Sequence, residues 1–193
     1  MAQAEPKDTL DSYITDMLAL EEHIAKAVDA QLADLRKEHP AFADTFSKAS
    51  SKTAQHIGAL NALKTSRHID AGSSVADVVK RAGSMVAGLG AAAIDLVRGD
   101  EKLSKNLRDD YTAYSLASIG YQMLFTTAIA LHDDEVTGHA RSHFTDYAQI
   151  VMDLSRAIPN AVIEDLKAQQ LPVRGDAGDL VQKEIKEIWE KLS

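Results

Sequence analysis

Apolar residues recur along four segments of this 193-residue chain in alternating steps of four and three. That rhythm puts each set on one face of an α-helix, and no long stretch shows the period of two that a half-buried strand needs. The sequence therefore predicts an all-α fold in one domain. We expect core helices at 8–37, 40–66, 101–132 and 134–158, a crossover helix at 74–98 and a C-terminal amphipathic helix at 178–192.

Two prolines bear on the helix boundaries. Pro40 stands where the second core helix should begin, a position that tolerates proline. Pro159 lies in an apolar stretch, and we expect it to end or kink the fourth core helix. The long connection between the second and third core helices is typical of a four-helix bundle with one crossover.

Composition excludes several classes of function. The net charge of −8 argues against nucleic acid as a partner, because that role needs a clustered basic surface. The chain has no cysteine, which excludes iron–sulfur clusters and disulfides. It has no phosphate-binding loop, so we expect no nucleotide. Residues 82–94 are too few to span a bilayer and the polar N-terminus lacks a secretory signal, which favours a cytoplasmic protein without a membrane partner.

Polar residues interrupt the apolar stripes of the predicted helices. Glu21, His56 and His143 each occupy a position where the stripe calls for an apolar side chain. Counting outward from the two expected helix turns puts Glu21 level with His56, and Tyr121 level with His143. Tyr114 stands one or two turns away. The sequence thus predicts a polar cluster near the middle of the bundle.

A carboxylate and two imidazoles in an apolar core have the chemistry of a divalent transition-metal site. We therefore expect Glu21, His56 and His143 to be the ligands, with Tyr114 and Tyr121 beside them. A metal-free alternative stays open, in which Glu21 pairs with His56 and the tyrosine hydroxyls complete a hydrogen-bonded network. A buried carboxylate needs a partner in either case.

Three further expectations concern residues outside this cluster. Asp110 should pair with a basic residue near the end of the bundle. Trp189 should dock on the body of the protein or on another subunit. Leu116, Ile119 and Met123 form a second apolar face on the third core helix, and a helix that is apolar on several sides is usually central.

The segment "DMLALEEHIAKAV" at residues 16–28 resembles the first helix of a bacterial ferritin-like family of stress-associated metal-binding proteins. Thr53, His56 and Leu60 fit the pattern of the second helix of that family, with histidine in place of its glutamine. The resemblance covers the first two helices in sequence and the rest in topology. The matching positions in the first helix are Asp16, Glu21, Lys26 and Ala27.

The resemblance implies a ferritin-like four-helix bundle, commonly a homodimer, with a di-metal site. Ferritin-type sites take a Glu-x-x-His motif from each of two helices. Here Thr53 and Ala140 stand in place of the two acids, so the resemblance implies a degenerate site that binds at most one metal ion, iron or manganese. The alternatives are an oxidative non-haem metalloenzyme with a Glu/His/His site and a metal-free structural or interaction module.

Overall fold

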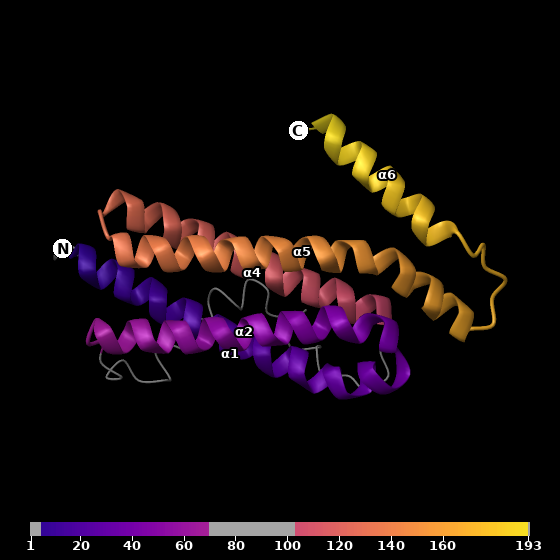
Figure 1. Cartoon of the computed structure of the whole chain (residues 1–193), viewed down its shortest axis with the longest axis horizontal. Helices are drawn as coiled ribbons and strands as arrows, with labels where there is room; N and C mark the ends of the chain where they lie inside the picture. The colour runs from indigo at the N-terminus through magenta and orange to yellow at the C-terminus, as the bar shows by residue number, and fades with distance from the viewer. Residues whose placement is uncertain (1–4, 70–102, 193) are drawn as a thin grey trace.

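A computed structural model of the chain describes residues 5–69 and 103–192, and the predicted crossover helix at 74–98 lies outside them. Within the described part there is no strand, which confirms the all-α class. None of the helices in that part is long and apolar enough to cross a membrane. The helices are α1 (Pro6–Glu38), α2 (Pro40–Ser66), α4 (Leu103–Ala130), α5 (Asp134–Ala168) and α6 (Ala177–Leu192), as Figure 1 labels them.

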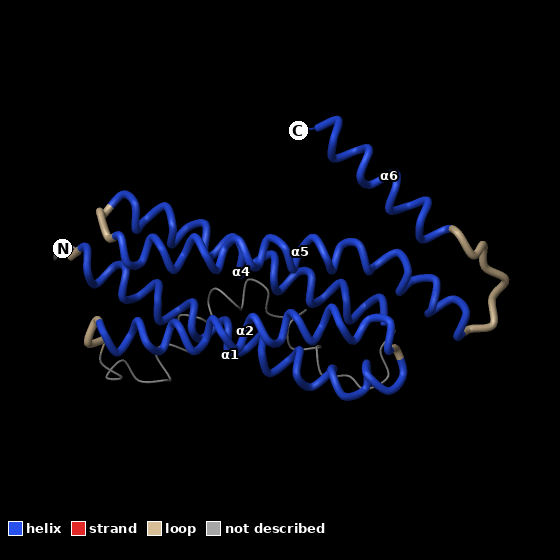
Figure 2. The backbone as a smooth tube through the Cα atoms, viewed as in Figure 1, coloured by secondary structure: helices blue, strands red, loops and turns tan. Residues whose placement is uncertain are grey.

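The first four of these helices lie side by side and share one core (Figures 1 and 2). α1 and α2 form one antiparallel hairpin, and α4 and α5 form another. α1 packs on α4, and α2 packs on α5. α2 and α4 run in the same direction, so α2 ends at the opposite end of the core from the start of α4. Every helix in the core therefore has antiparallel neighbours.

The helices begin and face inward as the sequence predicts. Both α1 and α2 begin with a proline. The first N–H groups of a helix have no hydrogen-bond partner within it, so the N–H that proline lacks is not needed there. The predicted stripes are almost entirely buried, and burying one such side chain stabilises the fold by about 1.5–3 kcal/mol. The buried stripe residues include Leu10, Ile14, Met17, Ile24, Phe46, Leu60, Leu107, Leu124, Val136, Ile150 and Leu154.

One arginine ties three helices together at one end of the core. Arg67 follows α2 and donates from Nε to Asp11 of α1 over 2.7 Å. Its Nη1 donates to Asp133 over 2.6 Å. Asp133 also caps α5 by accepting a hydrogen bond from the backbone N–H of Val136. The contact fixes the ends of both hairpins against each other.

The prediction that the fourth core helix ends at residue 158 is wrong. α5 continues through Pro159 to Ala168, although an interior proline costs about 3 kcal/mol. Tertiary contacts offset this cost. Ala161 is fully buried, and the Asp165 carboxylate accepts hydrogen bonds from the first backbone N–H groups of α4, those of Leu103 and Ser104. The extended part of α5 thus caps α4.

The expectation that the third core helix is central is also wrong. α4 buries one stripe, but Ile119 is 53% exposed and Met123 is 45% exposed. Of this second apolar face, Leu116 is partly buried against the core, whereas Ile119 and Met123 are exposed.

α6 packs on α5 and diverges from it toward the C-terminus (Figure 1). Gly178 permits close contact at the start of α6, because a Cβ there would lie 1.9 Å from Oδ1 of Asn160. Gln182 donates to the backbone carbonyl of Arg156 one turn later. Trp189 is 47% exposed and lines a groove between α5 and α6, so it is only partly covered by the described body of the protein.

Candidate metal centre

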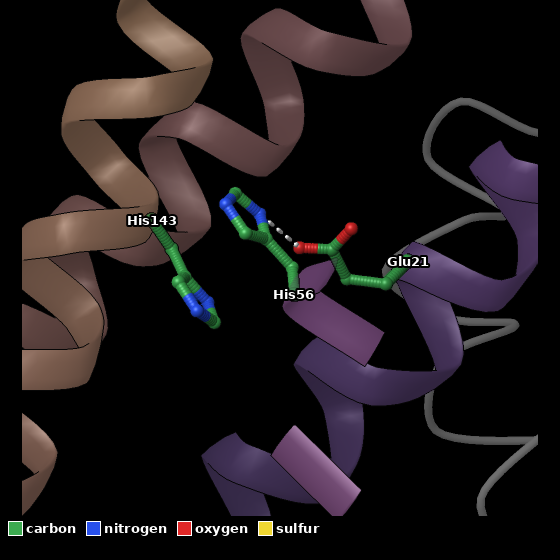
Figure 3. A group of neighbouring side chains, drawn as sticks. All are labelled: Glu21, His56 and His143. Atoms are coloured by element: carbon green, nitrogen blue, oxygen red, sulfur yellow. Dashed lines mark hydrogen bonds and ion pairs between the residues drawn. The ribbon is translucent and has the colours of Figure 1, made fainter. Parts of the chain in front are cut away.

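The structure brings Glu21, His56 and His143 together from three helices, α1, α2 and α5 (Figure 3). One oxygen or nitrogen atom of each side chain lies within 4.8 Å of the other two. Their exposed fractions are 0%, 2% and 4%, so the cluster is closed to bulk water. The predicted heights along the two hairpins are therefore correct.

Glu21 is the hub of the hydrogen bonds in this cluster. Its Oε1 accepts from the Tyr121 hydroxyl over 2.5 Å and faces Nδ1 of His56 over 3.2 Å. Its Oε2 accepts from the Tyr147 hydroxyl. Burial raises the pKa of the Glu21 carboxyl, and the hydrogen bonds from His56 and Tyr121 act in the opposite direction. Both oxygens of this fully buried carboxyl group thus have donors.

His56 lies between two carboxylates. Nδ1 faces Glu21, and Nε2 lies 3.1 Å from Oδ2 of Asp146. A ring with carboxylate oxygens at both nitrogens donates at both ends only when it is doubly protonated. Asp146 also accepts from Lys52 over 3.2 Å. Burial opposes ionisation of Asp146, but the hydrogen bonds from His56 and Lys52 outweigh it and hold its pKa below the ordinary value.

The contacts of His143 differ from those of His56. The two imidazole rings stack with their centroids 3.8 Å apart and their planes 10° apart. Tyr121 meets His143 edge-on. Burial, followed by repulsion from His56, lowers the pKa of His143 to about 3, so the ring is neutral near pH 7. Its Nδ1 is buried and has no hydrogen-bond partner among the described residues.

A second layer of hydroxyl groups lies next to Glu21. Thr53 donates to the backbone carbonyl of Ala49 and lies 3.0 Å from the Tyr114 hydroxyl. Tyr147 packs edge-on against Tyr114. Burial raises the pKa of both Tyr114 and Tyr121, which keeps these hydroxyls protonated as donors. Tyr114 therefore joins the cluster through Thr53 and Tyr147 rather than by touching Glu21.

Sequence reasoning missed Tyr147 and Asp146 as members of the site. A signal existed for Tyr147, because it lies one helical turn after His143 on the same buried stripe. No comparable signal existed for Asp146. It lies off the stripe, and only the packing of α2 on α5 brings it to His56.

The partner expected for Asp110 was also wrong. Asp110 is almost fully buried, and its Oδ1 accepts a hydrogen bond from the Gln31 amide of α1 over 3.4 Å. Gln31 and Asp110 are both polar residues that stand in the apolar stripes of their helices, α1 and α4, and they bind each other. Burial raises the pKa of Asp110 to about 7, and the charge of Asp109 adds to that shift.

Comparisons with known proteins leave the family open. No protein-family model matches the chain, and neither the curated proteins nor the solved structures contain a significant match to it. The resemblance to a ferritin-like family therefore stays a hypothesis that rests on the motifs in α1 and α2.

The chemistry available here is that of two nitrogen ligands and one carboxylate in a buried cluster. Glu21, His56 and His143 would hold the ion, but the rings of His56 and His143 are stacked with their planes 10° apart. One ring would therefore have to turn out of the stack for both to reach the same ion. Binding would also compete with the contact between His56 and Glu21.

Proposed function

We propose that this protein is a ferritin-like helical-bundle protein that binds a single divalent transition metal ion, iron or manganese, through Glu21, His56 and His143. The observation that carries the proposal is the buried, neutral His143 with an unpaired Nδ1 beside a buried carboxylate. An imidazole of this kind has a lone pair ready for a metal and needs no proton to leave. Two imidazoles and one carboxylate suit such ions.

The ferritin-like part of the proposal is supported by the arrangement of the helices. Two antiparallel hairpins pack together with α2 and α4 running in the same direction, as in bundles with one long crossover. The homodimer, the cytoplasmic location and the association with stress stay predictions from the sequence.

The limit of one metal ion is supported by the residues that stand where the ligands of a second ion would be. Thr53 makes hydrogen bonds to Ala49 and Tyr114, and Ala140 offers no ligand atom. Both stand three residues before a histidine of the cluster, where a ferritin-type site has its acids. Among the described residues, the only cluster of metal-ligand side chains is the one around Glu21.

The proposal implies that binding depends on pH. Glu21 must be ionised to bind a metal ion, and burial raises the pKa of its carboxyl. The apparent affinity should therefore rise with pH over the range in which Glu21 loses its proton. Asp146, which faces Nε2 of His56, would help to keep that ring oriented toward the ion.

A metal-free role is the second candidate, and the saturation of Glu21 favours it. Glu21 already meets His56, Tyr121 and Tyr147, and such a network can specify how two hairpins dock without any ion. In that case the protein is a structural or interaction module.

Metal analysis separates the two candidates. The protein is stripped with a chelator, dialysed against Fe²⁺ without oxygen or against Mn²⁺, and assayed for bound metal and thermal stability. The proposal predicts one ion per chain. At about a hundred times the dissociation constant, the ion should add about 2.7 kcal/mol to the free energy of unfolding. His143→Ala and Glu21→Gln should lose both effects.

His139→Ala is the matched control. It removes a histidine one turn before His143 on the same helix, outside the three-residue cluster. Its stoichiometry should equal that of the unsubstituted protein. Absence of bound metal in the unsubstituted protein, or equal loss in the control, would reject the metal site and leave the structural network.

A further inference from the structure

α6 is an amphipathic helix whose apolar face is left open. Val181, Ile185 and Ile188 follow steps of four and three, and Trp189 flanks them. Val181 is 46% exposed, Ile188 50% and Trp189 47%. Trp189 and Ile185 line an open groove of about 580 Å³ between α5 and α6. The described part of the chain thus leaves the stripe uncovered.

The charges of α6 fall into two groups. Lys183 pairs with Glu187, and Lys186 pairs with Glu190, each within the helix. Glu184 and Lys191 differ, because no described residue forms an ion pair with either of them. Both are exposed, they have opposite charges, and they lie one heptad apart along the same edge of the apolar stripe.

That pattern is complementary to itself when two copies of α6 run in opposite directions. Packing Ile185 of one copy against Ile188 of the other fixes the register, and the symmetry repeats the contact. In this register Glu184 lies beside Lys191 of the second copy, and Lys191 lies beside its Glu184. A parallel pair would instead put Glu184 beside Trp189 and leave both charges unmatched.

We propose that the open face of α6 is the contact surface of a homodimer, and that its occupant is α6 of a second copy in antiparallel orientation. The self-complementary charges identify this occupant, and the apolar stripe supplies the buried area. The contact is small for a protein interface, so the dissociation constant should lie in the micromolar range. The inference is independent of the metal site.

Sedimentation velocity on the full chain, across concentrations from well below to well above micromolar, tests this pairing. The unsubstituted protein should pass from monomer to dimer. Glu184→Lys or Lys191→Glu each puts like charges side by side at both edges of the symmetric pair. Each should raise the dissociation constant roughly tenfold. The double variant Glu184→Lys/Lys191→Glu restores opposite charges and should return close to the original value.

Two further variants complete the test. Ile188→Glu buries a charge in the stripe and should abolish the dimer, while circular dichroism checks that the four-helix core is intact. Glu187→Lys makes the same charge reversal as Glu184→Lys at a position of α6 that does not line the groove with Ile185 and Trp189, and it should leave the dimer unchanged. A protein that stays monomeric at all concentrations overturns the proposal. A dimer that ignores Ile188→Glu, or one that the double charge reversal fails to restore, also overturns it.

Discussion

Replacing Tyr147 by phenylalanine tests whether Glu21 is the hub of the buried cluster. The hydroxyl of Tyr147 is the hydrogen-bond donor to Oε2 of Glu21 among the described residues, whereas Oε1 has donors in both Tyr121 and His56. Tyr147→Phe therefore leaves one oxygen of a fully buried carboxyl group without a donor. Tyr121→Phe removes one of the two donors to Oε1, and His56 remains as the other.

The expected losses follow from the partner of each hydroxyl. A hydrogen bond to a charged group contributes about 1.5–3 kcal/mol, and a neutral one contributes about 0.5–1.5 kcal/mol. Tyr147→Phe should therefore lower the free energy of unfolding by roughly 3 kcal/mol and Tyr121→Phe by roughly 2 kcal/mol. Tyr114→Phe should cost roughly 1 kcal/mol, because its hydroxyl meets the neutral Thr53.

Urea unfolding of the chelator-treated protein, followed by far-ultraviolet circular dichroism, measures these losses. Tryptophan fluorescence would be the wrong probe, because Trp189 lies on α6 away from the core. Tyr147→Phe should also be measured in a Glu21→Gln background, where its cost should fall toward that of a neutral hydrogen bond. Equal losses for Tyr147→Phe and Tyr114→Phe, or an unchanged cost in the Glu21→Gln background, would refute the central role of Glu21.

Two further predictions concern charged groups outside the cluster. The pKa of Asp110 is raised from the ordinary 3.8 to about 7, so the folded state holds this proton more tightly and loses stability as pH rises between these values. Asp110→Asn should keep the contact with Gln31, add up to about 4 kcal/mol to the free energy of unfolding above about pH 7 and add little near about pH 4. Hydrogen bonds from the backbone and from Arg67 outweigh burial and lower the pKa of Asp133, so stability from this group is lost as pH falls through its folded pKa. Arg67→Met, which also frees Asp11, should cost roughly 1–3 kcal/mol near neutral pH and much less in acid, as urea unfolding at several pH values would show.

Periodicity in the sequence was sufficient to predict the stripes and the height of the buried cluster. In an antiparallel hairpin, residues equally far from the turn lie side by side, so Glu21 meets His56 once the turn is placed. The same argument places Tyr121 beside His143. These contacts follow from the position of the turn in each hairpin, and the turn can be located from the sequence.

The features that were missed depend on contacts between helices, which the pattern within one helix does not show. The cost of Pro159 argues for the end of a helix, but the gain from burying Ala161 and from the cap that Asp165 gives α4 is visible only after packing. Asp146 reaches His56 from an edge of α5 that carries no apolar signal. The sequence of an apolar face does not show what covers it, and this is why a second apolar face suggested a central helix although Ile119 is exposed.

The division of the core into two hairpins has a consequence for the order of folding. Among the hydrogen bonds to Glu21 described above, only the one with His56 lies within one hairpin, at a separation of 35 residues. The bonds from Tyr121 and Tyr147 to Glu21 span 100 and 126 residues, so they form when the hairpins dock. Loop closure makes such distant contacts late events in folding. The buried cluster is therefore assembled last, and tyrosine-to-phenylalanine changes in it should speed unfolding while leaving the folding rate nearly unchanged.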